Sequence, residues 1–321
     1  MSNKEPSLIV GIGDLHGQLS AFEGIIEKLN SLYSIFNNEK IKEDVQIVFC
    51  GDYIDRGENS KTLLEKIMNF QKQNTNVEAL NGNHELIALG ALDSIKEIDA
   101  EISSQETEGQ SHGLRRKLYR ALTLHGRNGG GKLLENFVEI DSTKSSKGLY
   151  LMLNTLSRNG EIGKWLRERP AGIIHSIAGR KILFIHGGVP ISVQDKTDLE
   201  NYFKAYSDHM KTKTCTFIKG SREKFIENPL VSSQSVFWVR DMPLRSQQSV
   251  QSQLSKLSID YAVFGHTPEE QIKMYHDCIF DIDVGMSSAY GGNDPAAIIF
   301  KQDGIFAVYQ SKPEPQKLRT I

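Results

Sequence analysis

Short apolar runs that end in polar, glycine-containing turns recur along the chain, and this pattern limits the fold more than any other feature. The runs are SLIVGIGDLHG, VQIVFCGDYIDRG, VEALNGNHE, KILFIHGG, YAVFGHT and CIFDIDVG. Their apolar residues do not alternate with polar ones, which predicts strands buried on both faces. Apolar residues at helical spacing occupy residues 19–29 and 63–68, between the early runs. The pattern therefore predicts βαβ units and an α/β fold with an at least partly parallel sheet.

The middle of the chain has a different character. From about residue 86 to 169, helical patterns alternate with an acidic polar stretch and the glycine-rich segment HGRNGGG. Strand-like runs resume at Lys181, so we predict one domain over residues 1–310 with a mainly helical cap insertion at about 86–169. Residues 311–321 are expected to form a frayed C-terminal tail.

Composition limits the partners and the compartment. The 321 residues are 39% hydrophobic and 24% charged, with a net charge of −2, which is typical of a soluble globular protein and gives no sign of nucleic-acid binding. Three widely separated cysteines, Cys50, Cys215 and Cys278, indicate a reducing compartment. No signal or membrane segment is recognised, so we expect a cytoplasmic protein without membrane contact. A monomer is a separate expectation, on which the sequence has no bearing. Export by a route that needs no cleaved signal would leave the same sequence.

The first turn, at residues 11–17, has two interpretations. Gly11 and Gly13 resemble the start of a dinucleotide-binding G-x-G-x-x-G motif, but His16 stands where that motif has its third small residue, and a glycine arrives one residue late at Gly17. Asp14 and His16 instead offer a carboxylate and an imidazole two residues apart, a pair suited to a divalent metal. Such a pair is common by chance, so a metal site at this turn requires further ligands from downstream segments.

Ligand-type side chains follow each predicted strand. A single histidine or aspartate in such a place would more often be a structural residue or a turn residue. Their repeated occurrence directly after separate strands favours a metal site, because the carboxyl ends of parallel strands share one rim of a sheet. Asn83 offers an amide oxygen, which is a weak ligand. A weak neutral ligand is sufficient where one aspartate already bridges two cations about 3.5–4 Å apart. The residues are Asp14, His16, Asp52, Asn83, His84, His186 and His266.

The order of the motifs resembles a known family. The strings GDLHG (13–17), GDYIDRG (51–57), GNHE (82–85), HGG (186–188) and GH (265–266) are similar to those of the phosphoprotein phosphatase family of calcineurin-like metallophosphoesterases, over roughly residues 8–310. The resemblance implies a four-layer α/β/β/α sandwich with two metals at its rim. It implies one metal bound by Asp14, His16 and Asp52, and a second bound by Asp52, Asn83, His186 and His266, with Asp52 as the bridge.

The implied chemistry is hydrolysis of a phosphomonoester. Two cations lower the pKa of a bridging water, and the resulting hydroxide attacks phosphorus in line. His84 is placed to give a proton to the leaving group, and Asp55 would orient His84 and favour its charged form. Arg56 and Asn83 would bind the phosphoryl oxygens. Arg240 stands where family members place a second phosphate-binding arginine, although an ordinary surface arginine is the alternative.

The substrate is the open question. The long insertion resembles the bacterial branch of the family, and we expect phosphoproteins or phosphopeptides as substrates, with serine and threonine favoured over tyrosine. One alternative is a hydrolase of dinucleoside polyphosphates such as diadenosine tetraphosphate. Another is a pseudo-enzyme that binds phosphorylated partners, although no ligand is missing. Four basic residues of the insertion would bind a polyphosphate if the substrate is a dinucleotide, and would otherwise form a solvated helix face. They are Arg115, Arg116, Lys117 and Arg120.

Manganese is the expected metal, with iron or zinc as alternatives. Asp281 and Asp283 are expected to orient rim loops. His125 has no assigned role, and residues 129–131 either shape the substrate entrance or form a hinge.

Overall fold

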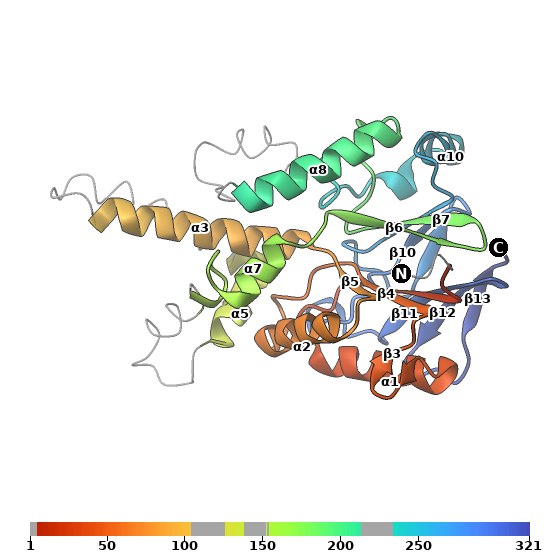
Figure 1. Ribbon diagram of the computed structural model, residues 1–321, viewed down its shortest axis with the longest axis horizontal. Coiled ribbons are helices and arrows are strands. Elements are labelled where there is room, and N and C mark those ends of the chain that lie inside the picture. The colour runs from red at the N-terminus through yellow and green to blue at the C-terminus, as the bar shows by residue number, and fades with distance from the viewer. Residues whose placement is uncertain (1–4, 104–125, 138–151, 153, 213–233) are drawn as a thin grey trace.

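Two β-sheets pack face to face, and helices cover the outer face of each sheet (Figure 1). The computed structural model describes residues 5–103, 126–137, 152, 154–212 and 234–321. The predicted α/β/β/α sandwich is confirmed by this arrangement. Within the described residues no helix is long and apolar enough to cross a membrane.

The first sheet carries the N-terminal βαβ units. Its strands run in the order β13-β12-β11-β1-β4-β5, and β1, β4 and β5 are parallel to one another. Helices α1 (Leu19–Tyr33) and α2 (Ser60–Gln73) cover its outer face (Figure 1). The strand bounds are β1 Leu8–Ile12, β4 Val45–Phe49, β5 Val77–Ala79, β11 Ala296–Lys301, β12 Gly304–Tyr309 and β13 Gln316–Arg319.

The second sheet has the order β6-β7-β8-β10-β9, and β7, β8 and β10 are parallel. Helices α8 (Lys196–Thr212) and α10 (Gln247–Lys256) lie on its outer side (Figure 1). Its strands are β6 Gly172–Ile177, β7 Arg180–Ile185, β8 Tyr261–Phe264, β9 Lys273–Tyr275 and β10 Ile279–Asp281. A separate hairpin joins β2 (Phe36–Asn37) to β3 (Lys40–Ile41). Both large sheets therefore contain the parallel strands that the sequence predicts.

The glycines of the first turn serve the packing between the sheets. A Cβ on Gly11 would lie 2.9 Å from the Phe184 ring on β7, and a Cβ on Gly13 would lie 2.3 Å from the carbonyl oxygen of Ile282. Any side chain at these two positions would push the sheets apart. The spacing that resembles a dinucleotide motif thus reflects close contact between two sheets.

The described part of the predicted cap insertion is helical. Helix α3 (Asn83–Ser103) extends away from the sheets (Figure 1). The turn η1 (Gly126–Gly130) leads into α5 (Gly131–Glu135), which contacts α2, and α7 (Glu161–Arg167) follows. A buried ion pair of 2.7 Å between Arg167 and Asp93 ties α7 to α3. Residues 104–125, including His125 and the basic group at 115–120, lie outside the described residues, and the limits of the insertion stay predictions.

The end of the chain differs from the expected frayed tail. Strand β13 pairs antiparallel with β12 as the edge of the first sheet, with Phe306 opposite Lys317. Leu318 packs against the hydrophobic core. The strand is short and polar, so its composition gave no signal for strand structure.

Candidate active site

The seven predicted ligand-type residues lie together at the rim formed by the carboxyl ends of the parallel strands. They follow β1, β4, β5, β7 and β8, so both sheets contribute to the rim. All seven are buried, with at most 4% of each residue exposed. The topology therefore brings residues from five separate motifs to one place, as the parallel strands predict.

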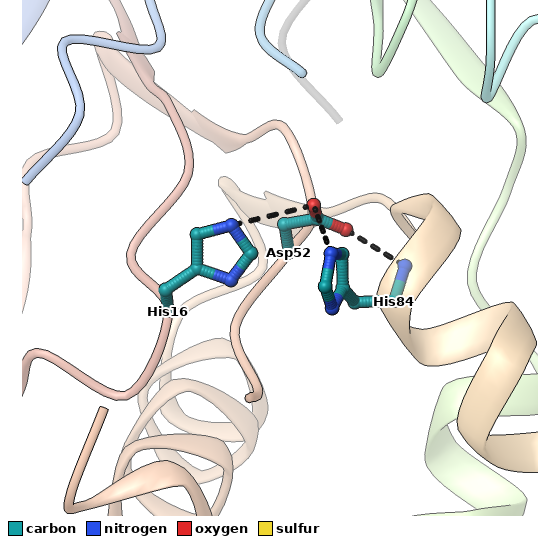
Figure 2. A group of neighbouring side chains, drawn as sticks. All are labelled: His16, Asp52 and His84. Atoms are coloured by element: carbon teal, nitrogen blue, oxygen red, sulfur yellow. Dashed lines mark hydrogen bonds and ion pairs between the residues drawn. The ribbon is translucent and has the colours of Figure 1, made fainter. Parts of the chain in front are cut away.

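Asp52 occupies the centre of this arrangement. Its Oδ1 accepts the backbone N–H of His84 at 3.0 Å, at the N-terminus of α3, where a helix favours negative charge. Its Oδ2 lies 3.6 Å from His16 Nε2 and 3.8 Å from His84 Nε2 (Figure 2). Its Oδ1 lies 3.4 Å from His186 Nε2. Each of these three histidines thus presents Nε2 to the carboxylate of Asp52.

Two groups of side chains at this centre could hold a metal ion, and both contain Asp52. One group is His16, Asp52 and His84, and the other is Asp52, His186 and His266; within each, the ligand atoms lie within 4.8 Å of one another. A carboxylate shared by two such groups is compatible with two neighbouring cations.

Hydrogen bonds to backbone carbonyls orient two of the histidines. His16 Nδ1 lies 2.8 Å from the Ile54 oxygen, and His186 Nδ1 lies 2.9 Å from the Cys50 oxygen. A carbonyl only accepts, so Nδ1 carries the proton and the lone pair of Nε2 points into the centre. His186 Nε2 also lies 2.9 Å from the amide oxygen of Asn83. Two electron-pair donors facing each other in a buried site fit a shared cation, so the donor set suits a divalent metal.

Asp14 lies beside these two groups rather than within them. Its carboxylate accepts the backbone N–H of His266 at 3.1 Å, and its Oδ1 lies 4.0 Å from His186 Nδ1. In the first group His84 stands where the resemblance implies Asp14. Asp14 thus fixes the loop after β8 at the rim, and its role as a ligand stays a prediction.

The pKa of His84 is shifted in the opposite direction from the pKa values of the other three histidines of the site. Burial, together with the charge of His84, lowers the pKa of His16 to about 3, and burial also lowers the pKa of His186 and of His266. These three imidazoles are therefore neutral at neutral pH, which is the form that binds metal. Burial alone would raise the pKa of Asp52, but the surrounding histidines together hold it well below its usual range.

His84 has a carboxylate partner in place of a carbonyl. Its Nδ1 lies 2.7 Å from Oδ2 of Asp55, which is fully buried. Burial alone would lower the pKa of His84, but the negative charges of Asp52 and Asp55 outweigh it and raise that pKa. The predicted pair of His84 and Asp55 is present as a contact, and it favours an imidazole that holds a proton.

Two arginines contact the site, one at each of the two groups of ligand-type residues. Arg56 Nη1 donates to His16 Nε2 at 2.6 Å, and Arg240 Nε donates to His266 Nε2 at 3.0 Å. Arg240 is otherwise exposed, and its guanidinium points into the site. The arrangement places one planar cation with several N–H donors beside each group of ligand-type residues.

Sequence reasoning gave no role to Glu85, which organises the loop that carries Asp52, Asp55 and Arg56. Its buried carboxylate accepts four backbone N–H groups: those of Asp52, Tyr53, Ile54 and Gly82, at 2.8–3.3 Å. The loop needs this support because Asp52, Asp55 and Arg56 have left-handed φ angles of 53°, 69° and 64°, each costing roughly 1–3 kcal/mol. The signal was in GNHE, where an acidic residue three positions after the helix N-cap reaches back to the cap N–H.

Glu85→Gln should therefore destabilise the folded protein. The amide keeps one acceptor oxygen, so two buried N–H groups lose their partner at roughly 1–3 kcal/mol each. We expect the free energy of unfolding in urea to fall by about 2–6 kcal/mol, and metal affinity to fall with it. Glu161→Gln, on the exposed face of α7, is the matched control. Unchanged stability in Glu85→Gln would show that the loop does not depend on this carboxylate.

Asp281 and Asp283 stand where the sequence predicts residues that orient a rim loop. Asp281 Oδ1 accepts the N–H of Asp283, and Asp283 Oδ1 accepts the N–H of Gly285. Burial raises the pKa of both carboxyls. The charge of Asp283 raises the pKa of Asp281 further, and the charge of Asp52 helps to raise the pKa of Asp283 to about 6. Their contacts fit the predicted structural role.

The two-sheet fold and the shared groups of histidine and aspartate fit a metal-binding phosphoesterase. The chain belongs to the calcineurin-like phosphoesterase family, whose model matches residues 7–270. It is 36% identical over 89 residues to the serine/threonine-protein phosphatase PP1-delta of Caenorhabditis elegans; this alignment covers 27% of the chain and only 26% of that relative's length. The predicted resemblance to phosphoprotein phosphatases is confirmed.

Solved structures share the fold at low sequence identity. A cold-active protein-tyrosine phosphatase of a psychrophilic Shewanella species superposes with a TM-score of 0.65 at 16% identity, covering 99% of this chain and 82% of that one. A protein serine/threonine phosphatase from Saccharomyces cerevisiae gives 0.54 at 12% identity, covering 99% of this chain and 84% of that one. At these identities the likeness shows the fold alone.

Proposed function

We propose that this protein is a metal-dependent phosphomonoesterase that removes phosphate from phosphoproteins, with phosphoserine and phosphothreonine favoured over phosphotyrosine. The observation that carries the proposal is the convergence of two guanidinium groups and the His84–Asp55 pair on one carboxylate-centred site. A phosphate dianion needs cationic donors of fixed geometry, and its leaving oxygen needs an acid. The similarity to PP1-delta supports serine and threonine as the hydroxyls released.

The metals belong to the proposal. Asp14, His16 and Asp52 would hold one divalent ion, and Asp52, Asn83, His186 and His266 a second, with manganese as the expected metal. When bound, such a pair supplies an activated water and neutralises charge on the phosphoryl group.

Side chains of the protein bind the phosphoryl group and supply the proton for the leaving group. Arg56 and Arg240 bind the phosphoryl oxygens and stabilise the charge that develops on them, and the Asn83 amide adds a donor. His84 gives its proton to the departing serine or threonine oxygen, because an alkoxide is a poor leaving group without one. Asp55 fixes the tautomer and the direction of the His84 ring through the 2.7 Å contact at Nδ1.

The test is kcat/KM of the chelator-stripped, manganese-reconstituted protein on phosphoserine, phosphothreonine and phosphotyrosine peptides beside diadenosine tetraphosphate. We expect turnover after reconstitution only, and the highest kcat/KM on the phosphoserine or phosphothreonine peptide. A preference for the dinucleotide would overturn the phosphoprotein assignment. Bound metal without turnover of any of the four would overturn the assignment as an enzyme.

A further inference from the structure

Arg56 lies on the face of an aromatic ring that the motifs do not include. Its Cζ is 4.4 Å from the centroid of Tyr290, in the turn η3 (Ser288–Tyr290) between β10 and β11. The same ring lies 5.9 Å from the His16 ring. A cation over an aromatic face is attracted to it, and the ring does not accept the in-plane N–H groups of the guanidinium, one of which, at Nη1, donates to His16 Nε2.

The backbone of Arg56 contacts Gly129, a residue of the cap insertion. Its N–H donates to the Gly129 carbonyl oxygen at 3.3 Å, and a Cβ on Gly129 would lie 2.7 Å from Arg56 Cγ and 3.1 Å from its nitrogen. Gly129 has a φ of 95°, which other residues rarely adopt. Arg56 thus fits a slot between Gly129 and Tyr290 that is closed to any larger residue at 129.

We propose that Tyr290 and Gly129 are positioning residues that fix the guanidinium of Arg56 for phosphate binding, and that the cap insertion contributes to this binding through Gly129. The inference builds on the proposed function, in which Arg56 binds the phosphoryl group. An arginine side chain has many rotamers, and holding it in one of them before the ligand arrives lowers the entropic cost of binding. The slot confines the side chain where it leaves the backbone and again at its charged end.

The test measures the affinity of inorganic phosphate for the manganese-loaded full chain by calorimetry, so that it does not depend on the substrate. Tyr290→Leu removes the aromatic face and should weaken phosphate binding about tenfold, whereas Tyr290→Phe keeps the face and should restore most of the affinity. Metal content should stay as in the unmodified protein. Equal losses in Tyr290→Leu and Tyr290→Phe would assign the effect to the hydroxyl and overturn the proposal.

A matched pair of glycine variants tests the second wall of the slot. Gly129→Ala should weaken phosphate binding about as much as Tyr290→Leu, while Gly131→Ala, where a Cβ would meet nothing within 4 Å, should not change it. In an Arg56→Ala background neither Gly129→Ala nor Tyr290→Leu should have a further effect, because the residue they position is gone. Additive losses in that background would overturn the proposal.

Failure of this inference and failure of the proposed function give different results. If the unmodified protein binds phosphate and hydrolyses no phosphopeptide, the proposed function fails while the slot is still tested. If it hydrolyses phosphopeptides and the slot variants bind phosphate with unchanged affinity, the slot proposal alone fails.

Discussion

Asp52→Asn is expected to remove bound metal and turnover together, with kcat/KM falling by at least about 10³-fold. Asp52 is the residue common to both groups of ligand atoms, so its charge serves both proposed metal sites. An asparagine has the same shape and can still accept the N–H of His84, which lies 3.0 Å from Oδ1. The variant therefore removes the negative charge while retaining the hydrogen bond that holds the N-terminus of α3.

Metal content by elemental analysis and kcat/KM on a phosphoserine peptide should be measured on the same preparation. Asp303→Asn is the matched control, because this aspartate is exposed and pairs across the surface with Lys301 at 3.5 Å. Far-ultraviolet circular dichroism checks that the Asp52 variant is folded. A metal-replete, active Asp52→Asn protein would disprove the bridging assignment.

There is a physical reason why the sequence predicts that the candidate site residues lie together. Residues such as Asp14, Asp52 and His186 directly follow buried parallel strands, and the topology of such sheets forces the carboxyl ends of the strands to one rim. A local pattern therefore carries information about a non-local arrangement. The same reasoning predicts the βαβ units around β1, β4 and β5.

Other features depend on contacts that no local pattern encodes. The ring of Tyr290 meets Arg56 only after the loop between β10 and β11 folds over the rim, and Gly129 meets it from a separate insertion. Strand β13 has four residues, QKLR, whose pairing with β12 depends on the sheet already present. Glu85 is intermediate, since its place on the first turn of a helix was readable but its bonds to the Asp52 loop were not.

His84→Asn should keep the metals and slow hydrolysis by an amount that depends on the leaving group. A general acid contributes roughly 10²–10⁴-fold when the leaving oxygen is basic, as in serine, and little when it is a stabilised nitrophenolate. We expect kcat for a phosphoserine peptide to fall within that range and kcat for nitrophenyl phosphate to fall by less than about tenfold. Asp55→Asn should show the same ordering with smaller losses, because it removes the partner that orients His84 at 2.7 Å.

The contrast between substrates separates proton donation from a role in metal binding, which matters because His84 Nε2 also lies within the first group of ligand atoms. A ligand would be needed for both esters alike, so its removal would lower metal content and slow both reactions equally. His175→Asn is the control: this histidine on β6 pairs with Glu78 away from the rim, and both esters should be unaffected. Equal loss for the two esters with reduced metal would assign His84 to the metal, whereas selective loss with full metal content would assign it to the proton.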